Sequence, residues 1–414
     1  VGVEYSVPAR GTWTIVHVGM LIPEAHEIFV CAAGCLRGVV LSAAEMNLTH
    51  RFSTVEITES NVLEGNMEEL IIEGVSDILR RLPKLPPAVL VYTSCIHHFM
   101  GCDLELCYRE LRDRFPDVDF TDCYMIPTMR KSGLTPDQIM RRQLYSLLPA
   151  GVKKTRSCAV LGNCFSMEDD SDLLQLIRHA GYDYYEITRC STYSEYQQMA
   201  ESSVYITTQP VANPGAAELS GRLEAKHLYL PVSFGTDEIR KNLTALADAL
   251  GCVYDGGVEA ETTAMEALHE SLAIIGDCPL AIDYTFTTRP LGLARLLLSQ
   301  GFQVRRIYLD SVAGEEKEDF LWLQQHAPQL LLFPTVHPNM RVIDRSNQDN
   351  YLALGQKAAY LTGTKHFVNL VENGGLYGFR GITRLAELMK QAHLQEADVE
   401  MLISRKGLGC ESCI

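Results

Sequence analysis

Short runs of β-forming residues alternate with amphipathic stretches of helical length along most of the chain, and this alternation limits the fold more than any other feature. Strands that are separated by helices pair in parallel and carry the helices on the faces of the sheet. The alternation begins again after the basic segment 153–156 and after Gly276. The sequence therefore predicts an α/β fold of three Rossmann-like domains, each a mostly parallel sheet flanked by helices.

The predicted domains cover residues 1–150, 151–270 and 271–414, the last with a C-terminal helix and tail. Strands are predicted at 27–30, 53–57, 88–92, 119–124, 184–187, 203–207, 280–284, 303–309 and 330–333. Helices are predicted at 67–81, 171–180, 216–226, 290–300 and 382–391. The apolar runs 87–92 and 330–333 have the length of buried strands.

Composition narrows the function classes. The chain has 414 residues, of which 47% are hydrophobic and 21% are charged, as in an ordinary large globular protein. A net charge of −16 disfavours nucleic acid as a partner, because phosphates would repel the protein. No run approaches the roughly 18 apolar residues of a membrane span, and we see no signal peptide at the start. We therefore expect a cytoplasmic protein with no membrane or nucleic-acid partner.

Cysteines gather where predicted strands end. Cys31 and Cys35 follow the first strand, and Cys95 follows the strand 88–92. Ligands of open α/β sheets bind at the carboxyl ends of strands. Disulfides are rare in reducing compartments, so iron–sulfur or zinc ligation explains these thiols better. Cys102 follows in the same glycine-containing region, and the predicted metal ligands are Cys31, Cys35, Cys95 and Cys102.

For any single cysteine, a buried structural role is a real alternative. Seven cysteines have no ligand-like context, and we predict that they lie in the core: Cys107, Cys123, Cys158, Cys164, Cys190, Cys252 and Cys278. Cys410 and Cys413 form a CxxC pair at the end of the sequence. This pair suits metal ligation, redox chemistry or a frayed tail equally well.

Two histidines are candidates for proton donation, because an imidazole titrates near neutrality. His98 follows Cys95 closely, and His337 lies between prolines after the predicted strand 330–333. The alternative is that His97 and His98 are a helix-end residue and a solvent-facing residue, and that His337 only shapes a turn. The glycine-rich stretch 374–381 precedes a helix but lacks the Gly-Lys-Ser/Thr ending of a phosphate-binding Walker A loop. A nucleotide enzyme is thus poorly supported.

The order of these segments resembles component 1 of the nitrogenase superfamily. The matching stretches are Phe29-Val-Cys-Ala-Ala-Gly-Cys35, Asn61-Val-Leu-Glu-Gly-Asn66, Ser94-Cys95 with residues 101–105, residues 213–237, Arg289-Pro-Leu-Gly292, and residues 376–381. They resemble, in order, the family's first cluster loop, the stretch before its next helix, its second cluster loop, a helix and strand of the second domain, the opening of the third domain, and its glycine-rich ending. The resemblance covers nearly the whole chain.

The resemblance implies a Cys-ligated iron–sulfur cluster of the [4Fe-4S] type or larger. Cys35 and Cys95 match two ligands of the electron-relay cluster that family members build at a subunit interface. The family's third ligand follows an Arg-Gly pair, whereas Thr12 stands at that position here. Cys31 is the candidate replacement, and Cys102 or a cysteine of a partner subunit would be the fourth ligand. A zinc-stabilised protein without a redox role is the blander alternative.

The positions that hold the family's iron–molybdenum cofactor fall near Thr207-Thr208 and on Tyr377, and neither carries the expected Cys or His. The resemblance therefore implies a nitrogenase-like oxidoreductase subunit that takes low-potential electrons from an ATP-dependent iron–sulfur partner and reduces something other than dinitrogen. The expected assembly is a homodimer or a heterotetramer with a related subunit. The alternative is a non-catalytic scaffold for metallocofactor assembly on the same fold.

Overall fold

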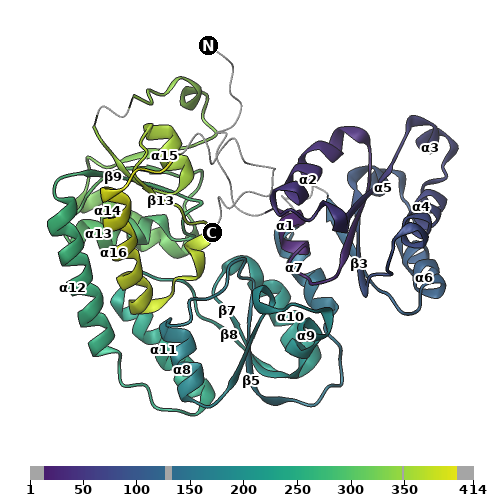
Figure 1. The fold of residues 1–414 in the computed structure, drawn as a ribbon, viewed down its shortest axis with the longest axis horizontal. Helices are drawn as coiled ribbons and strands as arrows, with labels where there is room; N and C mark the ends of the chain where they lie inside the picture. The colour runs from purple at the N-terminus through teal and green to yellow at the C-terminus, as the bar shows by residue number, and fades with distance from the viewer. Residues whose placement is uncertain (1–13, 126–132, 347–348, 399–414) are drawn as a thin grey trace.

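The computed structural model describes residues 14–125, 133–346 and 349–398. In this part of the chain the strands form three sheets, and every strand pairing is parallel. Figure 1 shows the three units along the chain, coloured from purple through teal to yellow. The predicted α/β fold with three parallel sheets flanked by helices is confirmed. The limits of the three predicted domains stay a prediction.

The first sheet has the strand order β2-β1-β3-β4. Its elements are α1 (Ile15–Gly19), β1 (His26–Cys31), α2 (Ala33–Glu45), β2 (Phe52–Glu56), α3 (Glu59–Glu64), α4 (Met67–Arg81), β3 (Ala88–Ser94), α5 (Cys95–Met100), α6 (Leu104–Arg114), β4 (Asp119–Met125) and α7 (Pro136–Ser146). The central strands β1 and β3 are buried throughout, as expected for parallel strands covered on both faces. Helix α4 has the predicted bounds, because Pro83 disfavours helical backbone at Leu82.

The second sheet has the order β6-β5-β7-β8. Its elements are β5 (Thr155–Leu161), α8 (Asp172–His179), β6 (Asp183–Glu186), α9 (Tyr193–Gln198), β7 (Ser202–Thr207), α10 (Asn213–Leu223), β8 (Lys226–Tyr229) and α11 (Thr236–Leu250). The predicted helix 216–226 was wrong at its end. Glu224 adopts a left-handed conformation with φ 53°, which ends the helix and lets the chain enter β8. Glycine is the usual residue at such a turn, so the sequence carried no signal for it.

The third sheet has the order β11-β10-β9-β12-β13. Its elements are α12 (Val258–Ile275), β9 (Pro279–Asp283), α13 (Pro290–Ser299), β10 (Gln303–Tyr308), α14 (Lys317–His326), β11 (Leu331–Phe333), β12 (Leu352–Leu354), α15 (Gln356–Thr362), β13 (Phe367–Val368) and α16 (Gly378–Leu394). The predicted strand 330–333 is present as β11, but the expectation that it is buried is wrong. Strand β11 lies at the edge of the sheet, where Leu331 and Leu332 are both exposed.

Apolar cores and sheets alternate through the described structure. Ile28 and Val30 face one core, whereas Phe29 and Cys31 face another, because successive strand residues point to opposite faces. The second core also contains residues of β5 and β7, so it joins the first sheet to the second. The opposite face of the second sheet, with Val160, shares a third core with the third sheet. The three units are therefore packed through shared apolar cores.

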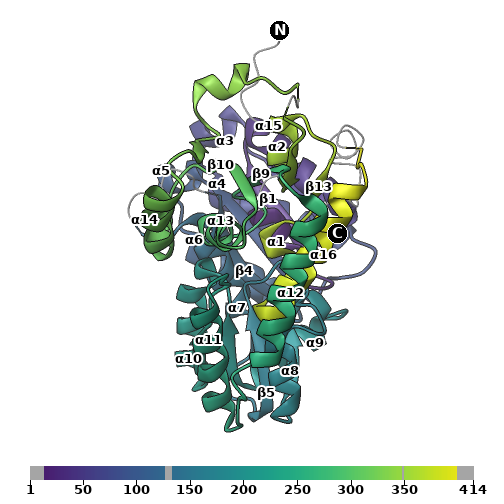
Figure 2. The same ribbon diagram turned by 90° about the vertical axis from the view of Figure 1, so that its left-hand side faces the viewer.

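Helix α16 closes the third of these cores. It places Phe379, Ile382, Leu385 and Met389 in the core that the second and third sheets share. Figure 2 shows α16 running beside α12, and these two helices pack against each other. The predicted helix 382–391 is confirmed, and it begins earlier than expected, inside the glycine-rich stretch. None of the described helices combines the length and the apolarity that crossing a bilayer requires.

Candidate metal centre and ligand pocket

In the first sheet, β2 lies on one side of β1, whereas β3 and β4 lie on the other side, so the order of the strands reverses between β1 and β3. Two of the predicted ligands lie at this point. Cys31 is the last residue of β1, and Cys95 directly follows β3. The two strands are neighbours, with Val30 paired to Thr93. Adjacent parallel strands are about 4.8 Å apart, so the backbones of both cysteines lie at one edge of the sheet. Reversal points of this kind are where open α/β sheets bind ligands.

Cys35 lies beside them on the first turn of α2, where it is exposed. The Cys31 thiol is buried, and burial raises its pKa to about 12, with a smaller contribution from the charge of Cys35. Cys35 is four residues after Cys31 in the sequence, on the first turn of the helix that follows β1. Thiolates are the ligands of iron–sulfur clusters, and a bound metal deprotonates a coordinating thiol. Cys31, Cys35 and Cys95 therefore have the chemistry of cluster ligands, and Cys31 and Cys95 stand at the ends of neighbouring strands.

Cys102 has a different position from these three thiols. It packs against the core that Val91 and Val30 share, whereas Cys31 faces the opposite side of the same sheet. Burial and the charge of Glu68 raise the pKa of the Cys102 thiol. Within the described residues, no three side chains of the metal-binding types lie close enough together to hold an ion. A cluster here would need ligands beyond those that the described residues bring together.

The remaining cysteines divide by burial. Four of those predicted to lie in the core are buried: Cys107, Cys123, Cys158 and Cys164. Cys190, Cys252 and Cys278 are only partly buried. The pair Cys410 and Cys413, and Thr12 near the other end, lie outside the described residues.

The histidines have simple local roles. His97 is buried, and its Nδ1 accepts a hydrogen bond from the Ser94 backbone N–H at 3.1 Å, which caps the start of α5. His98 is exposed on the same helix. His337 is also exposed, and its Nδ1 accepts a hydrogen bond from the Asn339 backbone N–H in the turn after β11. The structure therefore favours the helix-end alternative for His97 and the turn alternative for His337, and it leaves the side chain of His98 open to solvent.

The two positions aligned with the iron–molybdenum cofactor do meet in space. The Tyr377 hydroxyl donates to the Leu230 carbonyl at 3.3 Å, and the Leu230 N–H donates to the Thr207 carbonyl at 2.9 Å. Thr207, Thr208 and Tyr377 are all buried. The cavity beside Tyr377 measures about 10 Å³, which is room for one water molecule. These residues offer neither thiol nor imidazole, so they do not fit that cofactor.

A cavity of about 300 Å³ lies beyond these residues, between the second and third sheets. Thr208 and Tyr229, at the ends of β7 and β8, line one side. Arg289, at the start of α13, and Glu315, before α14, line the other side. A larger cavity of about 750 Å³ opens between α8, α12 and α16. We favour the smaller one as a functional site because strand ends border it.

Arg289 connects the two sides of this 300 Å³ pocket. Its buried guanidinium donates to the Glu238 carboxylate and to the Glu315 backbone carbonyl, both at 3.1 Å. It also pairs with the Glu315 carboxylate at 3.3 Å, and that carboxylate accepts the Tyr229 hydroxyl at 2.8 Å. A buried charge is stable only when it is paired in this way. The pocket wall is therefore a fixed network of charged groups.

A second carboxylate, Glu316, fastens α13 behind the pocket. It accepts hydrogen bonds from the backbone N–H groups of Leu291 and Gly292, at 2.7 and 3.1 Å. Burial raises the pKa of Glu316 to about 7, and these two hydrogen bonds offset part of the shift. Glu316 therefore changes charge near neutral pH.

Glu316 should make the stability of the protein depend on pH. Its folded-state pKa lies above the unfolded value, so its stabilising effect is complete below about pH 4.5 and is lost as the pH rises through 7. Between pH 5 and 8 this loss should reach about 2 to 3 kcal/mol. Urea unfolding of wild type and of Glu316→Gln at both pH values measures the difference. Equal pH dependence in the two proteins would contradict this assignment.

Sequence reasoning missed Arg289, Glu315, Glu316 and Tyr229 as site residues. The position of three of them at or after strand ends could have indicated a site, because Tyr229 ends β8 and Glu315 and Glu316 follow β10. The rule that ligands bind at strand ends was applied to thiols and not to carboxylates. The network itself could not be predicted, since it joins residues that are 26 to 86 positions apart in sequence.

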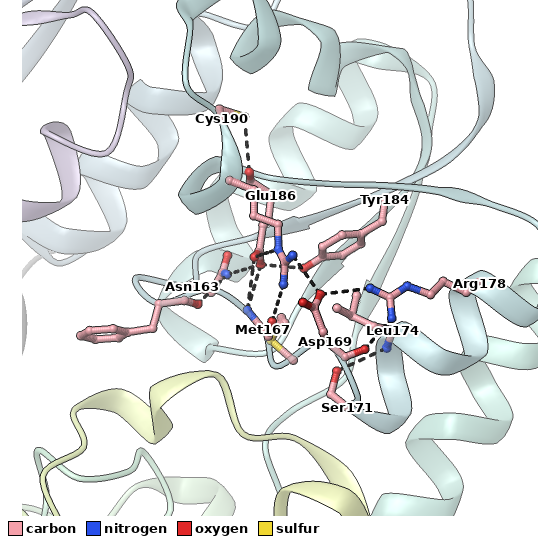
Figure 3. A network of polar contacts seen from close by, with 11 residues as sticks. Asn163, Met167, Asp169, Ser171, Leu174, Arg178, Tyr184, Glu186 and Cys190 are labelled. Atoms are coloured by element: carbon pink, nitrogen blue, oxygen red, sulfur yellow. Dashed lines mark hydrogen bonds and ion pairs between the residues drawn. The ribbon is translucent and has the colours of Figure 1, made fainter. Parts of the chain in front are cut away.

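A buried carboxylate holds the loop that follows β5, and Figure 3 shows its contacts. Glu186, at the end of β6, accepts hydrogen bonds from the side chains of Asn163, Tyr184 and Arg189 at 2.6 to 2.7 Å. The Met167 backbone N–H donates to it as well. The same loop reaches the third unit, where the Glu168 N–H donates to the Gly375 carbonyl at 3.1 Å. This loop therefore connects the second and third sheets.

The chain is similar to one protein family and to solved structures of a nitrogenase. A family model described as "Nitrogenase component 1 type Oxidoreductase" matches residues 13–392. The solved structure "Nitrogenase Cp1 at pH 6.5" is similar to the chain with a TM-score of 0.69 and 14% identity, over 95% of this chain and 94% of that one. "Nitrogenase Cp1 at pH 5" is similar with a TM-score of 0.57 and 13% identity, over 95% and 90%. The search of curated proteins found no match.

Proposed function

Because the chain belongs to the nitrogenase component 1 type oxidoreductase family, we propose that it is a reductase subunit that receives low-potential electrons through a Cys-ligated iron–sulfur cluster. The observation that supports this proposal is the position of Cys31 and Cys95 at the ends of the neighbouring strands β1 and β3, with Cys35 on the helix that follows Cys31. The cluster would supply one-electron chemistry at this edge. The protein would work in the cytoplasm.

The ligand set supports a site that a partner subunit completes. Cys31 and Cys95 stand at the ends of neighbouring strands and Cys35 on the following helix, while Cys102 packs on the opposite face of the sheet from Cys31. Cys35 is exposed, and the apolar side chains of Phe99 and Met100 are exposed on α5 next to Cys95. An exposed apolar patch of this kind is typical of an interaction surface. We propose a homodimer or a heterotetramer, with an ATP-dependent iron–sulfur protein as the electron donor.

The proposed substrate is not dinitrogen. The positions aligned with the ligands of the iron–molybdenum cofactor carry Thr207, Thr208 and Tyr377, none of which is a Cys or a His, although the His227 imidazole is hydrogen-bonded to Thr207. The 300 Å³ pocket beside Arg289 is the proposed substrate site. His98 and His337 remain candidates for proton donation only if the partner or the substrate reaches them, because both are exposed.

The test is an anaerobic count of iron and acid-labile sulfide on the purified protein, with its visible absorption spectrum. We expect stoichiometric iron and sulfide, and we expect Cys31→Ser with Cys95→Ser to lose both together with the colour. Because Cys31 is buried, Cys35→Ser with Cys95→Ser provides a second variant at more exposed positions. Retention of iron and colour in both variants would contradict the proposal.

Cys190→Ser is the matched control for these variants. Cys190 is partly buried like Cys95, and its thiol donates to the Glu186 backbone carbonyl, a hydrogen bond that serine can reproduce. This variant should keep its iron and sulfide. The scaffold alternative predicts a different outcome: the protein would release a loaded metallocofactor to an acceptor and would not couple ATP hydrolysis by the electron donor to a reduced product.

A further inference from the structure

We propose that the 300 Å³ pocket between the second and third sheets binds a small molecule through a cationic hydrogen-bond donor, an ammonium or an amidinium group. Pocket residues Thr208, Tyr229, Pro231, Val232, Arg289 and Glu315 carry this inference. It deepens the proposed function and rests on it for the view that the bound molecule is the substrate of the reductase.

The helix at the pocket is not available to an anion. Helix α13 begins at the pocket, and free N–H groups at the start of a helix would attract a negative group. Here the N–H groups of Leu291 and Gly292 donate to the Glu316 carboxylate from behind the pocket. The N–H groups at the start of α13 that would bind an anion therefore already have an acceptor inside the protein.

The charged donor of the pocket wall already has partners. Arg289 donates hydrogen bonds to the Glu238 carboxylate and the Glu315 carbonyl, and it forms an ion pair with the Glu315 carboxylate. The Tyr229 hydroxyl has one hydrogen, and it donates to Glu315. One guanidinium faces two carboxylates, so this network carries a net charge of −1. An incoming carboxylate would meet a net negative charge and a guanidinium that is already neutralised by two carboxylates.

Acceptors remain open in the same wall. An ionised carboxylate offers about four lone-pair directions, and among the described residues the polar partners of the Glu315 carboxylate are Tyr229 and Arg289. Its side chain is 38% exposed, so it can be reached from the pocket. Thr208 and Thr288 line the cavity with neutral hydroxyl groups. A cation that donates hydrogen bonds is therefore the ligand group that this wall complements best.

The rest of the cavity limits the size and shape of the molecule. Pro210, Pro231, Val232 and Ala313 provide an apolar wall that suits a short hydrocarbon body. A volume of about 300 Å³ lies at the lower end of the range for small-molecule sites. A small molecule with one cationic end and a short hydrocarbon body fits these limits.

Ligand-detected NMR with four probes of matched size tests the inference: cyclohexylamine, benzamidine, cyclohexanol and cyclohexanecarboxylate. We expect the two cations to bind at least about tenfold tighter than the alcohol and the carboxylate, which is about 1.4 kcal/mol. Glu315→Gln should weaken cation binding at least tenfold while keeping the acceptor for Tyr229. Val232→Phe fills the apolar side and should abolish binding of all four probes.

The control is Glu318→Gln, an exposed residue of α14 that should leave binding unchanged. The inference is overturned if the carboxylate binds as tightly as the cations, if no probe binds, or if Glu315→Gln binds the cations like wild type. The same measurement on the Cys35→Ser, Cys95→Ser variant, which is expected to lose its iron, separates the proposal of the ligand pocket from the proposal of the iron–sulfur cluster. Binding there supports the pocket whatever the iron count shows.

Discussion

Replacing Gly375 by alanine should lower the free energy of unfolding by about 3 to 5 kcal/mol. Gly375 has φ 84°, a conformation that costs alanine about 1 to 2 kcal/mol. In addition, a Cβ atom at this position would lie 2.0 Å from the Ser166 carbonyl oxygen, which is backbone and cannot rotate away. The contact between the loop after β5 and the third unit would have to open. Urea unfolding followed by circular dichroism measures the loss.

Gly221→Ala is the matched control. Gly221 lies in helix α10, is exposed, and has no atom within 4 Å of an added Cβ. Alanine has the higher helix propensity, so this variant should be unchanged or stabilised by up to about 1 kcal/mol. A Gly375→Ala protein as stable as the Gly221→Ala protein would show that the close contact at Ser166 is absent.

Removing the buried carboxylate of Glu186 should have an effect of similar size. Glu186→Ala leaves the Nε of Arg189, the hydroxyl of Tyr184 and the amide of Asn163 without their shared acceptor. Breaking a buried ion pair by removing one partner costs about 3 to 5 kcal/mol. The loop after β5 should then also become sensitive to protease. Urea unfolding and limited proteolysis of the purified variant measure the two effects.

Asp169→Asn provides the comparison within the same network. Asp169 pairs with both Arg178 and Arg189, but its side chain is 72% exposed. Exposed pairs contribute little, because water screens them. We therefore expect only a small fraction of the loss seen for Glu186→Ala. Equal losses in the two variants would show that burial of Glu186 is not what makes its contacts strong.

The first sheet could be predicted well because its strands are strongly apolar and separated by clear helices. Helix α4 was predicted with its observed bounds, since Pro83 marks its end. Errors arose where tertiary structure decided the outcome. The turn at Glu224 has a left-handed conformation, which glycine usually adopts and which the sequence therefore did not signal. Strand β11 is the edge strand of its sheet, and an apolar run alone does not distinguish an edge strand from a central one.

The candidate site could be predicted only in part. The common edge of Cys31 and Cys95 follows from parallel pairing of strands that alternate with helices, and sequence reasoning reached it. The placement of Cys102 did not follow, because it depends on how the chain turns after α5 at Gly101, which has φ 68°. Arg289, Glu238 and Glu315 come from three segments, and only the packed fold brings their charges together.

The position of α16 has a consequence for how the protein is made. This helix ends at Leu394, yet it covers a face that begins with β5, whose Val160 lies in the same core. At about 5 to 20 residues per second, a ribosome needs roughly 10 to 50 s to travel from one to the other. Helices α8 and α11 pack into the same core and are made first, so the part that waits for its cover is the part under Phe379, Ile382, Leu385 and Met389 of α16. The core between the second and third units is therefore closed only when translation of the described chain is nearly finished.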